Sequence, residues 1–236
     1  MKPSSLGVLF VHGIQGKPAQ FDFLEQLLPA DVRRMNVDLP GHGATAKEFR
    51  CAGMTDWLTS VKSQARELCQ SCDRVLFVGH SMGCLLGLLA TEEPDISFAG
   101  MLLLCCPFAI RPTLRYFRNN MLAIKTRGLT DDPFVKAAWE ANSVAVKSAA
   151  EYVTCLRPYL GLLRLIHRGN RQKSPPDCPV HFFFSSRDEI VSPRSAKRAA
   201  ALPCAEVGLL DGCGHNYFTQ DAKQLLCQQF RAMLQA

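Results

Sequence analysis

A short glycine-bounded motif around Ser81 constrains the fold of this chain more than any other feature. Gly79-His80-Ser81-Met82-Gly83 follows the apolar run at residues 74–78 and precedes a run of small and apolar residues at 84–90. A serine at the tip of a sharp strand-to-helix turn has a strained backbone that exposes its hydroxyl, and the flanking glycines let strand and helix approach closely. The pattern predicts a nucleophile elbow with Ser81 as the candidate nucleophile. The alternative is an ordinary glycine-rich turn whose serine caps the following helix.

Six hydrophobic runs bounded by turn residues predict strands, with helical segments between them. Several runs are almost continuously apolar, which is typical of parallel strands covered by helices on both faces. The alternation predicts the α/β class, with a mostly parallel, open sheet flanked by helices. The predicted strands are residues 6–11, 32–38, 74–78, 99–105, 180–185 and 206–210, and the predicted helices are residues 19–28, 54–70, 82–91, 193–202 and 218–234.

Residues 108–175 interrupt this alternation because their pattern is helical only. Apolar residues at helical spacing mark helices near 114–124 and 152–166, and Asp132-Pro133 opens another helix between them. We therefore expect one domain, in which residues 1–107 and 176–236 form the α/β core and residues 108–175 form a helical cap insertion. The insertion leaves the sheet after the strand that follows the elbow helix. It is thus placed to cover Ser81 and to line an acyl pocket.

The positive charge of the chain is concentrated in the same segment. Residues 108–175 contain 12 lysines and arginines against 4 acidic residues, whereas the remainder contains 15 basic and 17 acidic residues. The simpler interpretation is that these basic residues lie on solvent-exposed faces of the helices. The alternative is weak contact with an anionic membrane surface or an anionic substrate, which salt would screen. No nucleic-acid partner is expected, and no apolar stretch reaches the length of a transmembrane segment.

The 11 cysteines fall mostly within predicted strands and helices, where a free cysteine behaves as a small apolar residue. This distribution favours a reducing compartment, so we expect a cytoplasmic location. Cys69 and Cys72 form a C-x-x-C pair near the end of a predicted helix. No second pair completes a zinc site and no strand leads into the motif, so two packing residues are the favoured interpretation.

A serine nucleophile needs an imidazole base, and usually a carboxylate that orients the imidazole. Among the six histidines, His215 lies in a glycine-rich loop between the last predicted strand and the C-terminal helix, where sheets of this class carry their sites. A loop histidine with only local hydrogen bonds is the alternative. Asp188 follows the strand at 180–185, and its short side chain can be held rigidly against an imidazole. Glu189 is the rival carboxylate, and a surface ion pair with Arg187 is the alternative for either acid.

Acyl transfer also needs two backbone N–H groups directed at the oxyanion. The residue after the nucleophile, Met82, supplies one. The turn His12-Gly13-Ile14-Gln15-Gly16 is expected to supply the other from Ile14. Only backbone groups act here, so both side chains are free to form pocket wall. The alternative for this turn is a simple strand-to-helix connection.

These motifs resemble those of the α/β-hydrolase superfamily, in particular small capped bacterial carboxylesterases and monoacylglycerol lipases. The candidate residues also follow the chain order of that fold, Ser81 before Asp188 before His215. The matching segments are residues 11–16, 38–43, 79–83, 188–193 and 214–215.

The resemblance implies hydrolysis of a small-molecule ester, a short- to medium-chain acyl ester or a monoacylglycerol, through an acyl-enzyme. It implies no metal and no organic cofactor. One alternative is the same triad acting on an amide, thioester or carbon–carbon bond, and another is an acyl-ligand receptor without turnover. The sequence leaves the oligomeric state open.

Overall fold

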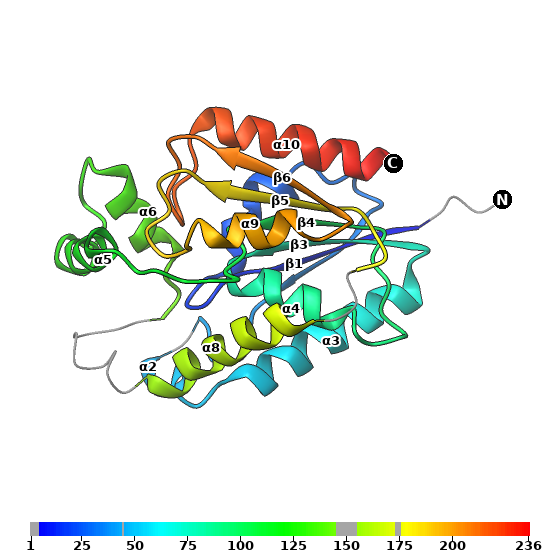
Figure 1. The fold of residues 1–236 in the computed structure, drawn as a ribbon, viewed down its shortest axis with the longest axis horizontal. Helices are drawn as coiled ribbons and strands as arrows, with labels where there is room; N and C mark the ends of the chain where they lie inside the picture. Colours follow the sequence, from blue (N-terminus) through cyan, green and yellow to red (C-terminus); the bar gives the residue numbers. More distant parts are fainter. Residues whose placement is uncertain (1–4, 44, 145–154, 173–175) are drawn as a thin grey trace.

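The computed structural model describes residues 5–43, 45–144, 155–172 and 176–236. Its strands form one six-stranded sheet in the order β2-β1-β3-β4-β5-β6, and every neighbouring pair is parallel (Figure 1). The predicted α/β class is therefore confirmed. Each predicted strand matches an observed one to within two residues at either end. The strands are β1 (Leu6–Val11), β2 (Arg33–Val37), β3 (Arg74–His80), β4 (Gly100–Leu104), β5 (Val180–Ser185) and β6 (Ala205–Leu210).

Helices cover both faces of the sheet. Three of them, α3 (Met54–Ser71), α4 (Met82–Ala90) and α8 (Leu156–Arg171), pack together on one face, while α10 (Gln220–Gln235) lies on the other (Figure 1). Apolar strands covered in this way bury their side chains on both faces, which explains their continuous apolar runs. The other described helices are η1 (Pro18–Phe21), α1 (Asp22–Glu25), α2 (Ala46–Phe49), α5 (Leu114–Thr126), α6 (Pro133–Ala141) and α9 (Arg194–Ala200).

Two short segments differ from the helices expected. The helix predicted at 19–28 is a 3₁₀ turn, η1, followed by the single turn α1. Phe21, Leu24 and Leu27 repeat every third residue, which matches the period of a 3₁₀ helix better than that of an α-helix. Helix α2 was not predicted because four residues are too few to show a helical period. A capping box between Thr45 and Glu48 defines its start.

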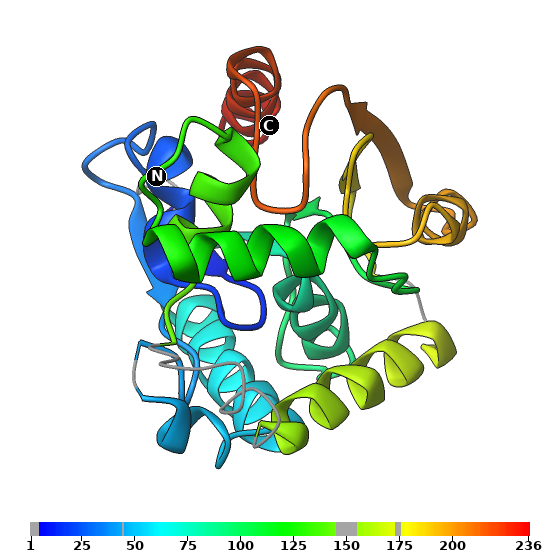
Figure 2. The same cartoon turned by 90° about the vertical axis from the view of Figure 1, so that its left-hand side faces the viewer.

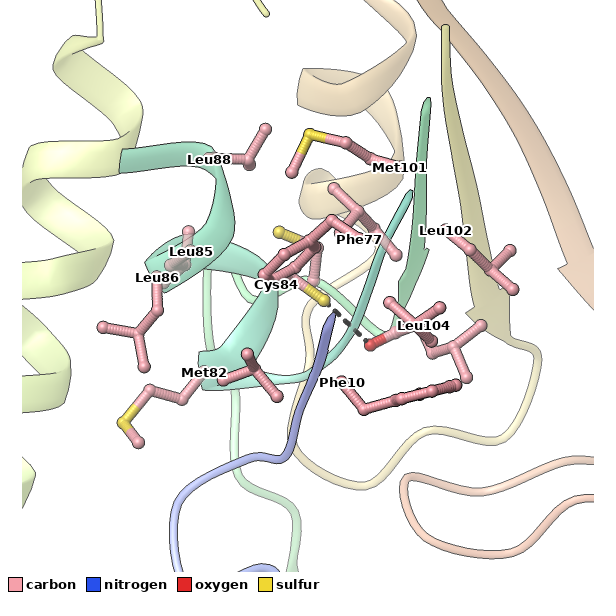
Figure 3. Packing of buried hydrophobic residues seen from close by; sticks show 14 of the residues in the cluster. Phe10, Phe77, Met82, Cys84, Leu85, Leu86, Leu88, Met101, Leu102 and Leu104 are labelled. Carbon is pink, nitrogen blue, oxygen red and sulfur yellow. Dashed lines mark hydrogen bonds between the residues drawn. The ribbon is translucent and has the colours of Figure 1, made fainter. Parts of the chain in front are cut away.

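The elbow helix α4 is apolar on all sides because it lies inside the molecule. All nine of its residues are buried, and its side chains pack among residues such as Phe10, Phe77 and Met101 (Figure 3). The Cys84 thiol donates a hydrogen bond to the Leu104 carbonyl oxygen at 3.3 Å (Figure 3). A Cβ at Gly83 would lie 2.0 Å from the Val11 carbonyl oxygen. The close approach of strand and helix that the motif predicts is therefore present.

The described segment between β4 and β5 contains the helices α5, α6 and α8, in agreement with its helical sequence pattern. Helices α5 and α6 pack on each other beyond the carboxyl ends of the strands (Figures 1 and 2). Helix α8 instead packs against α3 and α4 in the helix layer on one face of the sheet. The division into a core and a cap at 108–175 stays a prediction, and α8 packs as a core helix would. Residue 152, expected in the third helix, lies outside the described residues.

The 11 cysteines are all free in the structure. Cys69 and Cys72 are partly buried against the hydrophobic core, and the Cys69 thiol donates to the Ser97 carbonyl oxygen at 3.4 Å. The packing interpretation of this pair is confirmed. None of the helices that the structure describes is long and apolar enough to cross a membrane.

Candidate active site

Ser81 occupies the junction between β3 and α4 in a strained conformation, with φ 51° and ψ −120°. Its backbone N–H donates to the Leu104 carbonyl oxygen at 2.8 Å, which fixes the turn against β4. The Ser81 hydroxyl does not cap α4. It donates instead to Nε2 of His215, with Oγ and Nε2 3.0 Å apart. The geometry is that of the predicted elbow and excludes the helix-cap alternative.

His215 lies between the hydroxyl and a carboxylate. Its Nδ1 donates to Oδ2 of Asp188 at 2.9 Å, while its Nε2 faces Ser81. The side chains of His215 and Asp188 are 7% and 6% exposed, so water competes little for these hydrogen bonds. Asp188, and not its rival Glu189, contacts the imidazole. The structure thus brings together three residues expected from distant parts of the sequence.

The surroundings of His215 and Asp188 favour a negatively charged Asp188 and stabilise the positively charged form of His215. Burial by itself would lower the pKa of His215, but the charge and hydrogen bond of Asp188, aided by the charge of Glu189, raise it above its ordinary value. Burial would likewise raise the pKa of Asp188. The charge and hydrogen bond of His215 and the backbone N–H groups of Val191 and Ile190 outweigh burial and lower it. Asp188 is therefore ionised, and a protonated His215 is stabilised beside it.

The backbone of His215 is held by two buried residues whose roles the sequence did not reveal. Glu189 accepts a hydrogen bond from the His215 backbone N–H at 2.8 Å, and His80 donates from Nε2 to the His215 carbonyl oxygen at 2.9 Å. Burial, followed by the charge of His215, lowers the pKa of His80 to about 3, so His80 stays neutral. Contacts from side chain to distant backbone leave no pattern in sequence, so spacing could not have identified them.

The turn that contains Ile14 lies directly against Ser81, since a Cβ at Gly13 would be 2.9 Å from the Ser81 Cβ. His42 fixes this turn by accepting from the Gln15 backbone N–H at Nε2, at 2.9 Å. Burial, then the charge of His12, lowers the pKa of His42 to about 3, so His42 remains a neutral acceptor. In the described part of the chain, no protein group accepts a hydrogen bond from the backbone N–H of Ile14 or Met82. Both stay candidates for the oxyanion hole.

A cavity that opens to solvent adjoins Ser81 and His215. Tyr116 and Asn120 of α5 and Ala138 of α6 contribute to its walls, so the expectation that helices after β4 line a pocket beside Ser81 is confirmed. Ile14 also lines the cavity. The Met82 side chain, expected to be free for the pocket wall, is fully buried in the core.

Among the described residues, His80, Cys105 and His215 lie close enough to hold a metal ion, since one possible ligand atom of each is within 4.8 Å of the others. Their chemistry does not fit a metal. Burial, then the charge of Asp188, raises the pKa of the Cys105 thiol well above its ordinary value, which disfavours the thiolate ligand. Both ring nitrogens of His215 are engaged by Ser81 and Asp188. The expected lack of a metal and of an organic cofactor stays a prediction.

Sheet, elbow and site together define the class of protein. The chain belongs to the alpha/beta hydrolase family, whose model matches residues 8–228, and the resemblance seen in the sequence is confirmed. A thermostable monoacylglycerol lipase of Bacillus sp. (strain H-257) is 28% identical over 195 residues, which are 81% of this chain and 74% of that protein.

Solved structures share the fold. A structure reported for the metagenome-derived lipolytic enzymes LipS and LipT has a TM-score of 0.73 at 20% identity, covering 99% of this chain and 95% of that chain. The monoacylglycerol lipase of Paleococcus ferrophilus has a TM-score of 0.69 at 15% identity, covering 96% of this chain and 94% of that chain.

The pH dependence of activity tests the electrostatics of the site. We expect kcat/KM for ester hydrolysis to rise with pH, with a midpoint above the ordinary histidine value of 6.5, because only neutral His215 accepts the serine proton. Glu189→Gln removes a charge that raises this pKa but keeps an acceptor for the His215 N–H. Its midpoint should therefore move to lower pH, while the plateau changes by less than about threefold. A pH profile of both proteins measures this, and an unchanged midpoint in the variant would contradict the contribution of Glu189.

Proposed function

We propose that this chain is a serine hydrolase that cleaves carboxylic esters through an acyl-enzyme intermediate. The observation that carries the proposal is the line of hydrogen bonds from the Ser81 hydroxyl through His215 to Asp188, with separations of 3.0 Å and 2.9 Å. Because this line adjoins the cavity, a bound ester would have its carbonyl carbon within reach of Ser81.

In the proposed mechanism, the Ser81 oxygen attacks the ester carbonyl carbon while Nε2 of His215 takes the hydroxyl proton. Asp188 keeps the proton of His215 on Nδ1 and stabilises the imidazolium. The backbone N–H groups of Ile14 and Met82 bind the negative oxygen of the tetrahedral intermediate. His215 then protonates the leaving alcohol. In the second half of the reaction, His215 takes a proton from water, and the water oxygen attacks the acyl-enzyme carbonyl carbon. The Ser81 oxygen then leaves, takes back the proton from His215, and the acid is released.

One sequence relative and two similar structures support ester hydrolysis as the reaction of this triad. The relative from Bacillus is a monoacylglycerol lipase, and two similar structures are lipolytic enzymes. We therefore propose short- to medium-chain acyl esters or monoacylglycerols as substrates. An amide, a thioester, a carbon–carbon bond and ligand binding without turnover remain the alternatives.

A substrate panel tests the proposal. It consists of p-nitrophenyl esters of increasing acyl length, glycerides, and the thioester and amide of the best acid. We expect the oxygen esters to have the highest kcat/KM and a fluorophosphonate probe to label Ser81. Faster cleavage of the thioester or amide would replace the proposed reaction. A lack of labelling together with tight acyl-ligand binding would favour a receptor.

We also propose weak contact with an anionic membrane surface through α5. Leu114, Phe117 and Met121 are spaced to share one face of this helix, and they are 89%, 55% and 70% exposed. The segment 108–175 that contains α5 also carries the basic surplus of the chain. Apolar side chains beside basic residues suit an interface of acidic lipids.

Vesicle sedimentation checks this contact. The protein should sediment with phosphatidylserine vesicles at low ionic strength, and about 0.5 M salt should release most of it because salt screens the charges. Leu114→Ser combined with Met121→Ser should weaken binding several-fold by removing apolar contact. Leu209→Ser is the control, since Leu209 is 65% exposed on β6. No sedimentation at low salt would remove the proposal.

We propose a cytoplasmic location because the cysteines are free, and free cysteines are retained most readily in a reducing compartment.

A further inference from the structure

Gln15 has an unexpected backbone conformation for a residue with a side chain. Its φ is 57°, in the left-handed region that favours glycine. The backbone is fixed on both sides, because the Gln15 N–H donates to His42 and its carbonyl oxygen accepts from the N–H and hydroxyl of Ser143, at 2.8 Å and 3.2 Å. Glycine would adopt this conformation with less strain.

The side-chain amide of Gln15 forms no hydrogen bond with the described residues. Its Nε2 is buried without a hydrogen-bond partner, and so is Nε2 of Gln20. Both residues line the cavity that contains Ser81 and His215. A buried N–H donor without an acceptor is costly, and such groups in proteins are nearly always completed by another molecule or group. Two such groups on residues that line the same cavity point to an acceptor that the substrate brings.

The surroundings of Gln20 also favour a polar substituent. Gln20, Ala141 and Asn216 line both this cavity and a neighbouring one, which Lys17 also lines. Amide and ammonium N–H groups donate to hydroxyl, ether or carbonyl oxygens. A hydrocarbon substituent in the same place would leave them without partners, which is how sites built around hydrogen bonds reject apolar analogues.

We propose that Gln15 and Gln20 form a hydrogen-bonding subsite for an oxygen-bearing substituent of the substrate, adjacent to the ester that Ser81 attacks. The proposal rests on the proposed function and extends it, because it predicts selectivity for hydroxylated esters over simple alkyl esters. The oxygen belongs either to the alcohol part, as in a polyol ester, or to the acyl part, as in a hydroxy acid. Both sources offer the same acceptor chemistry.

Three esters distinguish these sources. Ethyl butanoate carries no extra oxygen, 2,3-dihydroxypropyl butanoate carries hydroxyls on the alcohol, and ethyl 3-hydroxybutanoate carries one on the acyl group. The wild type should prefer one hydroxylated ester over ethyl butanoate. In Gln15→Met and in Gln20→Met, kcat/KM for that ester should fall about 10- to 100-fold, while kcat/KM for ethyl butanoate stays within about threefold.

Matched variants separate binding from structure. Gln224→Met changes an exposed glutamine of α10 and should alter none of the three values. Gln15→Gly relieves the left-handed strain, so it should keep or raise the melting temperature and still lose the preference. An equal loss on all three esters, or no loss on any, would overturn the subsite.

Inactivity of the wild type on all three esters would refute the proposed function instead. Calorimetric binding of 2,3-dihydroxypropyl butanoate and of ethyl 3-hydroxybutanoate to the wild type and to Gln15→Met then tests the subsite alone. We expect one of them to bind the wild type more tightly than the variant. Equal affinity for the two proteins would overturn the subsite.

Discussion

Replacing Ser81 with alanine is expected to lower turnover of an ester by about 10⁶-fold while the protein stays folded. The hydroxyl is the only group that the substitution removes, and no other side chain in the described residues hydrogen-bonds to Nε2 of His215. His215 and Asp188 then have no nucleophile to activate, so the loss of Ser81 alone should cost about as much activity as the loss of all three residues. The change is measured by kcat on the best ester and by loss of fluorophosphonate labelling. The melting temperature of the variant shows whether the fold is retained.

Ser60→Ala is a suitable control. The Ser60 hydroxyl accepts a hydrogen bond from Gln64 within α3, so its loss should leave both kcat and labelling unchanged. Substantial ester hydrolysis by Ser81→Ala, with a normal melting temperature, would mean that another group is the nucleophile. The proposed mechanism would then be wrong.

Replacing Asp188 with asparagine is expected to lower kcat by about 10⁴-fold. Oδ1 of Asp188 accepts from the backbone N–H groups of Ile190 and Val191, at 2.8 Å and 2.7 Å. An asparagine oxygen would remain with these two donors, so its NH₂ group would face His215. Nδ1 of His215 would then have to accept, which moves the ring proton to Nε2. In that tautomer Nε2 cannot take the proton of Ser81.

Glu189→Gln is the matched control for this change, because Glu189 is the adjacent acid and contacts only the His215 backbone among the described side-chain hydrogen bonds. It should lower kcat only slightly. Steady-state kinetics of both variants at the pH optimum provide the comparison. A severe loss in Glu189→Gln with a mild loss in Asp188→Asn would assign the orienting carboxylate to Glu189.

The fold could be predicted where the pattern of apolar residues is local and repeats along the chain, as in long strands and helices. The four inner strands, β1, β3, β4 and β5, are almost entirely buried and have nearly continuous apolar runs, and every predicted strand became a parallel strand of the sheet. The long helices α3 and α10 show their period over several turns. Helix α2 has a single turn, and the packing of α8 against α3 and α4 depends on surfaces that its own sequence does not contain. The predictions were therefore least complete for short elements and for the neighbours of each helix.

The sequence by itself determined the sheet, the elbow and two candidate site residues, Ser81 and His215, because glycine spacing and strand ends place such groups through short-range geometry. It also fixed their order along the chain. Only the tertiary structure decided between Asp188 and Glu189, since adjacent acids differ in the direction of their side chains and not in any pattern. The support of His215 by His80, and the unpartnered amide of Gln15, likewise arise from contacts between distant segments. Such contacts exist only once the chain has folded and the burial of each polar atom is set.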